Sequence, residues 1–289
     1  MDKKISIIGG DLRIVKLAQM LAEEGEEVYT YAIEQAEVLA KYKNIKFCSD
    51  LKGAVKDMDI IIGPIPLSSN AEDVNTQFSN KKITILELFE NIDSGLFVAG
   101  RLTDDIKNLA EENNVKYIDI LEREELAVLN AISTAEGTIQ IAMEETTRTI
   151  HGSLVLVMGF GRIGKIIAKM LDGIGARVYC EARKNSDLAW IKAYGYTPVH
   201  LNDVENIFPK FDLIINTIPK VILTEEKLKL IKKECLLIDI ASSPGGVDKV
   251  AAKRLGVKNI WALSLPGKVA PHTSAEFIKE TLSNIMSEM

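Results

Sequence analysis

Residues 154–164, Leu-Val-Leu-Val-Met-Gly-Phe-Gly-Arg-Ile-Gly, decide the fold of this 289-residue chain. The apolar run is short enough for a buried strand, and it ends in the G-x-G-x-x-G spacing of Gly159, Gly161 and Gly164. An amphipathic segment over 166–171 follows at once, so the glycines lie between a predicted strand and a predicted helix. That context favours a dinucleotide-binding motif over an ordinary glycine-rich turn.

Each glycine of this motif has a physical role in binding a dinucleotide. The first permits a tight turn, the second lets a pyrophosphate approach the backbone, and the third lets the helix pack closely on the strand. The start of the helix also offers backbone N–H groups to the phosphates. The alternative is a glycine-rich turn in an α/β domain that binds no nucleotide. We predict a cofactor-binding turn made of Gly159, Phe160, Gly161, Arg162, Ile163 and Gly164.

The end of the next predicted strand, over 176–181, bears on which dinucleotide binds. NAD sites place an Asp or Glu there to bond the ribose hydroxyls. Side chains alternate along a strand, so Val178, Cys180 and Ala182 are expected to point the same way. In that register the residue at the ribose is Ala182. A shift of one residue would instead place Glu181 on the ribose and favour NAD.

The residues that follow this strand favour NADP. With Ala182 at the ribose, Arg183, Lys184 and Ser186 would surround a 2′-phosphate. A guanidinium can hold a phosphate with two hydrogen bonds. The alternative for Arg183 and Lys184 is a solvated basic loop. We therefore predict NADP as the cofactor, with NAD as the second choice.

Composition and charge exclude several classes of protein. Hydrophobic residues make up 47% of the chain and charged residues 26%, which suits a globular protein of two domains. No run of about 18 apolar residues occurs, so we expect no membrane span. The N-terminus leads straight into a predicted strand without a signal-peptide pattern, and we expect a cytoplasmic protein. The net charge of −6, without a broad basic stripe, argues against nucleic-acid binding.

Cysteine and histidine are too scattered to predict a metal site. Cys48, Cys180 and Cys235 form no C-x-x-C pair, and all lie on or near predicted strands. They are expected to be buried, reduced thiols. The three histidines show no metal-ligand spacing either.

Strand and helix patterns alternate along the whole chain, which predicts parallel sheets. We predict an α/β protein of two Rossmann-like, doubly wound domains separated by a cleft. Strands are expected at 5–8, 28–31, 45–47, 60–63, 83–86, 116–118, 154–158, 177–180, 197–199, 213–216, 236–240 and 260–262. In the first half, helices are expected near 12–24, 71–78 and 103–112.

The predicted domains are 1–130 on the substrate side and 131–273 on the cofactor side. Ser133 and Glu136 are spaced as a capping box, which predicts the start of a long interdomain helix over 135–150. A final helix over 274–289 could pack back on the first domain.

The first half is assigned to the substrate because its opening turn lacks the three-glycine spacing. Asp11 would also repel a phosphate at that helix start. Arg13 could receive a substrate carboxylate, or it could be a surface arginine. In open α/β sheets ligands bind outside the carboxyl ends of the strands. Thr217 and Pro219, which follow a predicted strand of the cofactor half, are therefore expected beside the nicotinamide.

Several stretches together resemble dipicolinate synthase, in the family of its A-type subunits. The resemblance covers essentially the whole chain, and the combination of stretches is far more specific than the glycine motif alone. The stretches are Gly9–Arg13, Asn130–Gly137, Thr149–Ser153, Asn216–Pro219, Ser243–Gly246 and Leu265–Pro271.

The resemblance implies an enzyme of spore formation in the lysine/diaminopimelate branch. Its expected substrate is a small dicarboxylate, either a dihydrodipicolinate or its hydroxylated tetrahydro precursor, and its product is pyridine-2,6-dicarboxylate. Expected partners are the flavoprotein-like B-type subunit of dipicolinate synthase and further copies of this chain, in the mother cell of a sporulating bacterium. Arg13, Lys268 and His272 are the candidates to bind the carboxylates, and His272 or a water could take the proton.

The wider fold also resembles the D-2-hydroxyacid dehydrogenases, which are the rival enzyme class. Their catalytic histidine lies in a Pro-His stretch like Pro271-His272. Their substrate-binding arginine is absent, because the corresponding loop reads Ser242-Ser243. A non-catalytic protein that only binds the nucleotide is the third possibility.

Overall fold

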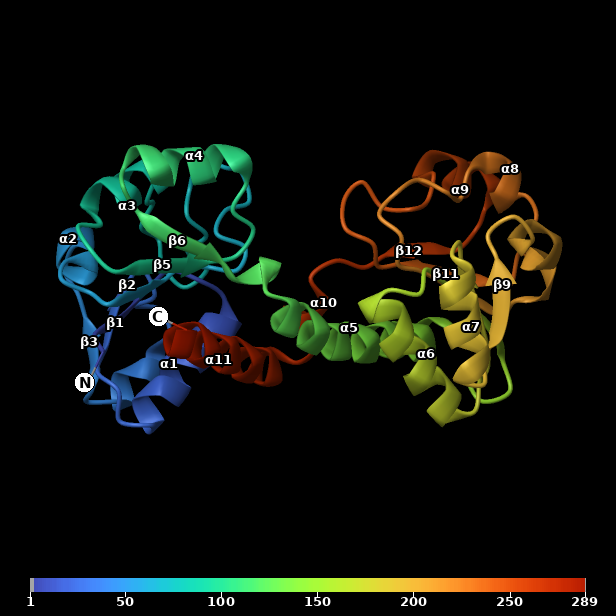
Figure 1. Cartoon of the computed structure of the whole chain (residues 1–289), viewed down its shortest axis with the longest axis horizontal. Helices are drawn as coiled ribbons and strands as arrows, with labels where there is room; N and C mark the ends of the chain where they lie inside the picture. The colour runs from blue at the N-terminus through green and yellow to red at the C-terminus, as the bar shows by residue number, and fades with distance from the viewer. Residues whose placement is uncertain (1–2, 289) are drawn as a thin grey trace. The chain divides into compact units, whose positions relative to one another are not determined.

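The computed structural model describes residues 3–288, which form two compact units. The first unit contains the described residues up to Ala127 and those from Ala270 onward, and the second contains Val128–Val269. Each unit is built around one six-stranded parallel sheet with helices on both faces (Figure 1). The predicted α/β class with two Rossmann-like sheets is confirmed.

The sheet of the first unit has the strand order β3-β2-β1-β4-β5-β6. This order reverses direction between β1 and β4, as in a doubly wound fold. Its strands are β1 (Ile5–Ile8), β2 (Val28–Tyr31), β3 (Ile45–Phe47), β4 (Ile60–Ile62), β5 (Leu96–Ala99) and β6 (Lys116–Asp119). Its helices are α1 (Leu12–Glu23), η1 (Glu37–Lys41), α2 (Leu51–Val55), α3 (Ile85–Asn91), α4 (Asp104–Glu112), η2 (Ile120–Glu122) and α11 (Pro271–Glu288).

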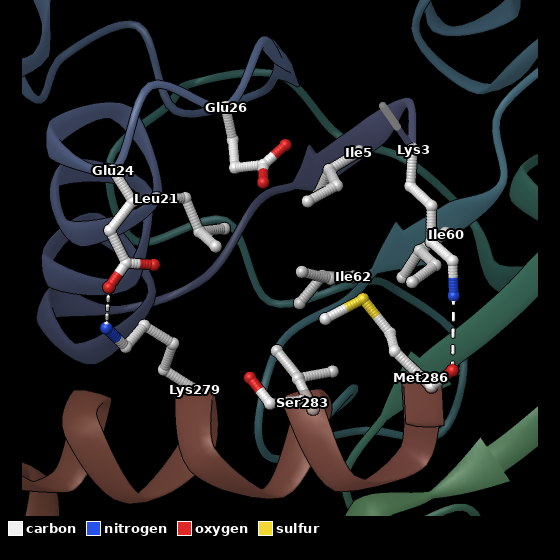
Figure 2. A pocket seen from close by; sticks show the side chains of 11 residues that line it. Lys3, Ile5, Leu21, Glu24, Glu26, Ile60, Ile62, Lys279, Ser283 and Met286 are labelled. Carbon is white, nitrogen blue, oxygen red and sulfur yellow. Dashed lines mark hydrogen bonds and ion pairs between the residues drawn. The ribbon is translucent and has the colours of Figure 1, made fainter. Parts of the chain in front are cut away.

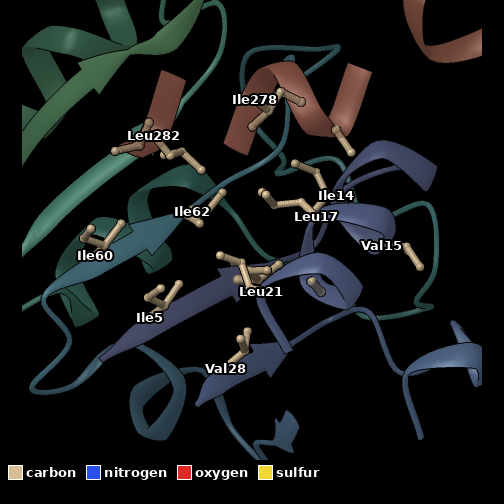
Figure 3. Packing of buried hydrophobic residues seen from close by; sticks show 14 of the residues in the cluster. Ile5, Ile14, Val15, Leu17, Leu21, Val28, Ile60, Ile62, Ile278 and Leu282 are labelled. Carbon is tan, nitrogen blue, oxygen red and sulfur yellow. The ribbon is translucent and has the colours of Figure 1, made fainter. Parts of the chain in front are cut away.

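The C-terminal helix α11 packs on α1 and contributes to the core of the first unit. Lys279 forms an ion pair with Glu24, and Lys3 Nζ donates to the carbonyl of Met286 at 3.3 Å (Figure 2). Ile278 and Leu282 are buried with α1 residues and with β1 and β4 (Figure 3). The other face of the sheet packs against α2, α3 and α4. The C-terminal helix therefore completes the hydrophobic core on one face of the N-terminal sheet.

The second unit repeats the same topology, in the order β12-β11-β10-β7-β8-β9. Its strands are β7 (Leu154–Met158), β8 (Arg177–Ala182), β9 (Thr197–His200), β10 (Leu213–Asn216), β11 (Leu236–Asp239) and β12 (Asn259–Trp261). Its helices are α5 (Glu124–Glu145), α6 (Arg162–Ile174), α7 (Asn185–Ala193), η3 (Val204–Lys210), α8 (Glu225–Leu228), α9 (Lys249–Leu255) and α10 (Leu265–Val269). Helices α5, α6 and α7 cover one face, and η3, α8 and α9 cover the other.

Burial on both faces explains why the central strands are continuous apolar runs. Every residue of β10 and β11 is buried, and so are four of the five residues of β7. Cys180 and Cys235 are free and buried, and burial raises the pKa of both thiols to about 12. Both therefore stay protonated at neutral pH. Cys48, also free, is only partly buried.

Two predicted elements of the first unit are wrong. Residues 71–78 form no helix but an irregular segment joined to its neighbours by single bridges, such as Ser68–Val74. The Ser69 hydroxyl donates to Asn75 Oδ1, inside this segment, at 2.9 Å. The segment predicted as a strand at 83–86 instead starts α3, because the Thr84 side chain accepts from Glu87 N and caps the helix. The fifth strand of the sheet is β5, which the prediction missed.

The predicted helix start at Ser133 is also wrong. Helix α5 begins at Glu124 and ends at Glu145, so the sequence boundary between the units lies within it. Ser133 lies in its interior, 1% exposed, and its hydroxyl has no hydrogen-bond partner. The residues before it are strong helix formers, and Glu124 and Glu125 suit the first turn, so the helix starts earlier.

Candidate dinucleotide-binding site

The turn between β7 and α6 has the geometry that the glycine spacing predicts. Gly159 has φ +91°, in the left-handed region that favours glycine. A Cβ on Gly164 would lie 2.0 Å from the carbonyl oxygen of Gly159, so only glycine lets the helix approach the strand this closely. A Cβ on Gly161 would meet nothing within 4 Å, which leaves the backbone open to a ligand.

The start of α6 suits an anion. Gly161 is its N-cap residue and provides no side-chain hydrogen bond, and the helix is 13 residues long. The N–H groups of the first turn and the helix dipole both favour a phosphate here. Arg162 is exposed and Ile163 is partly buried. Phe160 is buried against Tyr194, with ring centroids 6.3 Å apart, so its side chain packs within the unit.

The side chains of strand β8 alternate between the two faces of the sheet. Val178, Cys180 and Ala182 belong to the core cluster that contains α6, whereas Tyr179 packs in the opposite cluster. Ala182 is therefore on the face of the glycine turn's helix, and it has no carboxylate to offer a ribose. Arg183, Lys184 and Ser186 follow it and are all exposed.

Glu181 lies on the opposite face and is 1% exposed. Its Oε2 accepts a hydrogen bond from the backbone N–H of Gly159 at 3.1 Å, and its Oε1 has no partner. Burial raises the pKa of this carboxyl, although the Gly159 hydrogen bond and the charges of Arg183, Lys227 and His200 act in the opposite direction. The alternation of the strand gave no reason to expect a buried carboxyl here.

We expect Glu181→Gln to stabilise the protein increasingly as pH rises. The folded-state pKa of Glu181 lies above its ordinary value of 4.5, so ionisation penalises the folded state. The penalty is absent below the ordinary value and grows as pH rises through the raised value. Urea unfolding between pH 4 and pH 9 measures the difference in free energy of unfolding between the variant and the wild type. A difference that is constant across this range would contradict a raised pKa for Glu181.

The carboxyl ends of β10 and β11 carry a buried polar network that the sequence predictions missed. Asp239, fully buried, accepts from Asn216 Nδ2 at 2.8 Å, from Ala241 N at 3.2 Å and from Gly246 N at 2.8 Å. The signal in the sequence is a single Asp at the end of an apolar strand. This network shapes the loop from Ser242 to Gly246.

One of the two predicted nicotinamide residues, Thr217, lies beside the glycine turn. Thr217 Oγ1 donates to the carbonyl of Met158 at 2.9 Å, and a Cβ on Gly159 would lie 2.5 Å from that hydroxyl. Thr217 thus holds the end of β7 against the end of β10. Pro219 is exposed two residues further on.

The three predicted substrate residues belong to three different helices. In the first unit, Arg13 bonds to Asp11, with Nη2 2.7 Å from Oδ2, and to the carbonyl of Ile65. A substrate carboxylate would have to compete with Asp11 for this guanidinium. His272, in the first turn of α11, is 65% exposed and lies 3.7 Å from Glu276. Lys268 lies in α10 of the second unit and is exposed.

The first unit also has a cavity of about 240 Å³ between α1 and α11 (Figure 2). Ile5 and Ile60 line it, and each begins its strand. The cavity is therefore at the amino ends of the strands, opposite to the edge where ligands of such sheets bind. Within residues 3–288 no cluster of His, Cys, Asp or Glu is suited to a metal ion, and no helix has the length and apolarity to cross a membrane.

A doubly wound sheet with this glycine turn defines a dinucleotide-binding domain. Residues 128–253 match the family model of the D-isomer specific 2-hydroxyacid dehydrogenase NAD-binding domain. The chain is also 27% identical over 117 residues to glyoxylate reductase of Thermococcus kodakarensis, covering 39% of this chain and 33% of that enzyme. The protein is thus an oxidoreductase that uses a nicotinamide dinucleotide.

Residues 4–121 match the family model of the N-terminal domain of the dipicolinate synthase A-type subunit. The corresponding dipicolinate synthase protein of Bacillus subtilis is 32% identical over 290 residues, covering 99% of this chain and 96% of that protein. The crystal structure of its counterpart from Bacillus halodurans superposes with a TM-score of 0.92 at 30% identity, covering 100% of this chain and 99% of that one. The chain belongs to the family of dipicolinate synthase A-type subunits.

Proposed function

We propose that this protein oxidises a dihydrodipicolinate, or its hydroxylated tetrahydro precursor, to pyridine-2,6-dicarboxylate with NADP. The single observation that carries the proposal is the whole-length relationship to dipicolinate synthase. The complete glycine turn supports it. The reaction belongs to spore formation in the cytoplasm of the mother cell. The predicted partners are the flavoprotein-like B-type subunit and further copies of this chain.

The geometry of the turn fits a dinucleotide, and the end of β8 supports NADP over NAD. The cradle at Gly159–Gly164 is open at Gly161, where a phosphate would approach. Ala182 offers no carboxylate to the ribose, and Arg183 is exposed where a 2′-phosphate would be held. Lys184 and Ser186 flank it. When bound, the nicotinamide accepts the hydride that leaves the substrate ring.

The chain's own residues supply binding and orientation. Loss of a hydride and a proton converts the dihydrodipicolinate to an aromatic pyridine, and the hydroxylated precursor loses a water molecule as well. Aromatisation supplies driving force, so the protein mainly has to orient the reactants. The two substrate carboxylates require cationic or N–H partners, and Arg13, Lys268 and His272 are proposed for that purpose. Thr217 and Pro219 are proposed to lie beside the nicotinamide. His272 or a water takes the ring proton.

A D-2-hydroxyacid dehydrogenase is the second candidate, because the cofactor domain matches that class. This chain also has Pro271-His272, as that class does. However, Ser242 and Ser243 occupy the loop where that class carries its substrate arginine. A panel of 2-oxo acids with reduced cofactor distinguishes the two. Turnover of any of them at a rate above that on the dihydrodipicolinate would favour this second candidate.

We expect the purified chain, mixed with NADP and the product of dihydrodipicolinate synthase, to generate the ultraviolet absorbance of a pyridine. The measurement is made with and without the partner protein. Absorbance in neither case would contradict the proposed reaction. Cofactor binding without turnover on any substrate would indicate a non-catalytic role.

Arg183→Ala is expected to weaken NADP binding by about 1.5–3 kcal/mol, the usual size of a charge-assisted hydrogen bond. This corresponds to roughly a 10- to 150-fold rise in Kd. NAD has no 2′-phosphate, so its affinity should hardly change. Arg177→Ala, at the exposed opposite end of β8, is the matched control. Calorimetry that shows an equal loss for NAD and NADP would contradict the assigned role.

A further inference from the structure

Glu181 is a carboxyl group of the second unit that is buried and only half-satisfied. One oxygen accepts from the N–H of Gly159, the first residue of the glycine turn, at 3.1 Å. The other oxygen has no hydrogen-bond partner, although the side chain is only 1% exposed. A buried, ionised carboxylate with an unused oxygen is costly, because an unsatisfied polar atom loses its water without compensation.

A proton on Oε1 would change this balance. The neutral carboxyl keeps its acceptor oxygen on Gly159 and gains an O–H donor on the other oxygen. Within residues 3–288 no acceptor contacts that oxygen, so the donor lacks a partner until a ligand supplies one. The ligand proposed for this turn carries a diphosphate and ribose oxygens, all of which accept hydrogen bonds.

The charges around Glu181 make its protonation depend on the cofactor. Arg183 lies two positions further along the chain, Lys227 is in α8, and His200 ends β9, and each favours the ionised carboxylate. A 2′-phosphate held by Arg183 would neutralise one of these three. A diphosphate at the start of α6 would add negative charge beside Gly159. Both changes favour the neutral carboxyl.

We propose that Glu181 takes up a proton from solvent when NADP binds, and that it then donates a hydrogen bond to an oxygen of the bound dinucleotide. This inference rests on the proposed cofactor site. It makes Glu181 a cofactor-binding residue, and it makes the affinity for NADP fall as pH rises. No covalent bond is formed or broken apart from the O–H bond of the carboxyl.

The test is calorimetry of NADP binding at pH 7 in buffers with different heats of ionisation, which counts the protons taken up. The free 2′-phosphate also titrates, with a second pKa near 6, so the decisive quantity is the difference between variants. Wild-type protein is expected to take up as much as about one proton more than Glu181→Gln. Glu234→Gln makes the same change at an exposed position of the second unit, and it should retain the wild-type count.

The pH dependence of affinity gives a second readout. Glutamine mimics the neutral carboxyl, so the Kd of Glu181→Gln for NADP should depend less on pH than the wild-type Kd and should be the lower of the two above pH 8. The wild-type Kd should rise by up to about tenfold per pH unit through the transition relative to that variant. Glu181→Ala removes the acceptor for Gly159 and should bind NADP more weakly at every pH.

Infrared difference spectra of wild-type protein, with NADP minus without, avoid any folding defect of a variant. A new protonated-carboxyl band supports the proposal. Its absence, or equal proton counts for wild type and Glu181→Gln, overturns it while NADP binding itself survives. Failure of NADP to bind to either protein overturns the proposed cofactor together with this inference.

Discussion

Gly164→Ala is expected to abolish NADP binding and to destabilise the protein by about 3 kcal/mol or more, at the upper end of overpacking effects. The new Cβ would lie 2.0 Å from the carbonyl oxygen of Gly159 and 3.1 Å from its carbonyl carbon. Both are backbone atoms, which cannot rotate away as a flexible side chain can. Helix α6 must therefore move from β7, and the turn that receives the diphosphate changes shape.

Helix α6 provides its own control, because Gly173 lies in its last turn and a Cβ added there would meet nothing within 4 Å. Gly173→Ala should leave NADP binding unchanged and stabilise the protein by about 0.5–1 kcal/mol, the helix propensity difference. Urea unfolding and calorimetry measure both effects. Normal NADP binding by Gly164→Ala would show that close packing at this turn is not required.

Asp239→Ala is expected to lower the free energy of unfolding by about 3–5 kcal/mol, because three buried donors lose their acceptor at once. These are Asn216 Nδ2, Ala241 N and Gly246 N, at 2.8, 3.2 and 2.8 Å. Asp239 is fully buried, so water cannot replace the lost hydrogen bonds without opening the structure. The loop after β11 should become more mobile.

Two comparisons sharpen this prediction. Asp239→Asn keeps acceptor capacity on one oxygen and should lose less stability than Asp239→Ala. Asp248→Ala removes only the N-cap of α9, whose carboxylate accepts from Ala251 N, and should cost about 1 kcal/mol. Equal decreases in the free energy of unfolding for Asp239→Ala and Asp248→Ala would contradict the larger stabilisation expected from the buried network. Hydrogen exchange of Gly246 N–H reports the loosening of the loop.

Much of the second unit could be predicted because its signals are local. The apolar run before Gly159 and the glycine spacing specify a strand, a turn and a helix that follow one another directly, as β7 and α6 do. The alternation of Val178, Cys180 and Ala182 along β8 likewise follows from strand geometry alone. The resemblance to dipicolinate synthase also depends on short motifs within this single sequence.

The wrong predictions lie where local signals compete. Ser133 and Glu136 have the spacing of a capping box, yet the helix formers before them extend α5 back to Glu124. Residues 71–78 have a helical pattern but form isolated β-bridges with other segments. Capping motifs predict a helix start only when the preceding residues cannot themselves be helical.

The sequence by itself determined the alternating strands and helices of two Rossmann-like units, the glycine turn and the alternation of side chains along β8, because periodicity and glycine spacing act over short distances. Only the tertiary structure decided that α11 completes the N-terminal unit, that Asp239 satisfies three donors, and that Glu181 reaches Gly159. Apart from the local Ala241–Asp239 hydrogen bond, these contacts join residues at least 7 positions apart, and 255 positions apart in the ion pair of Lys279 with Glu24. Their energies depend on burial and hydrogen-bond geometry, which arise only when the chain has folded.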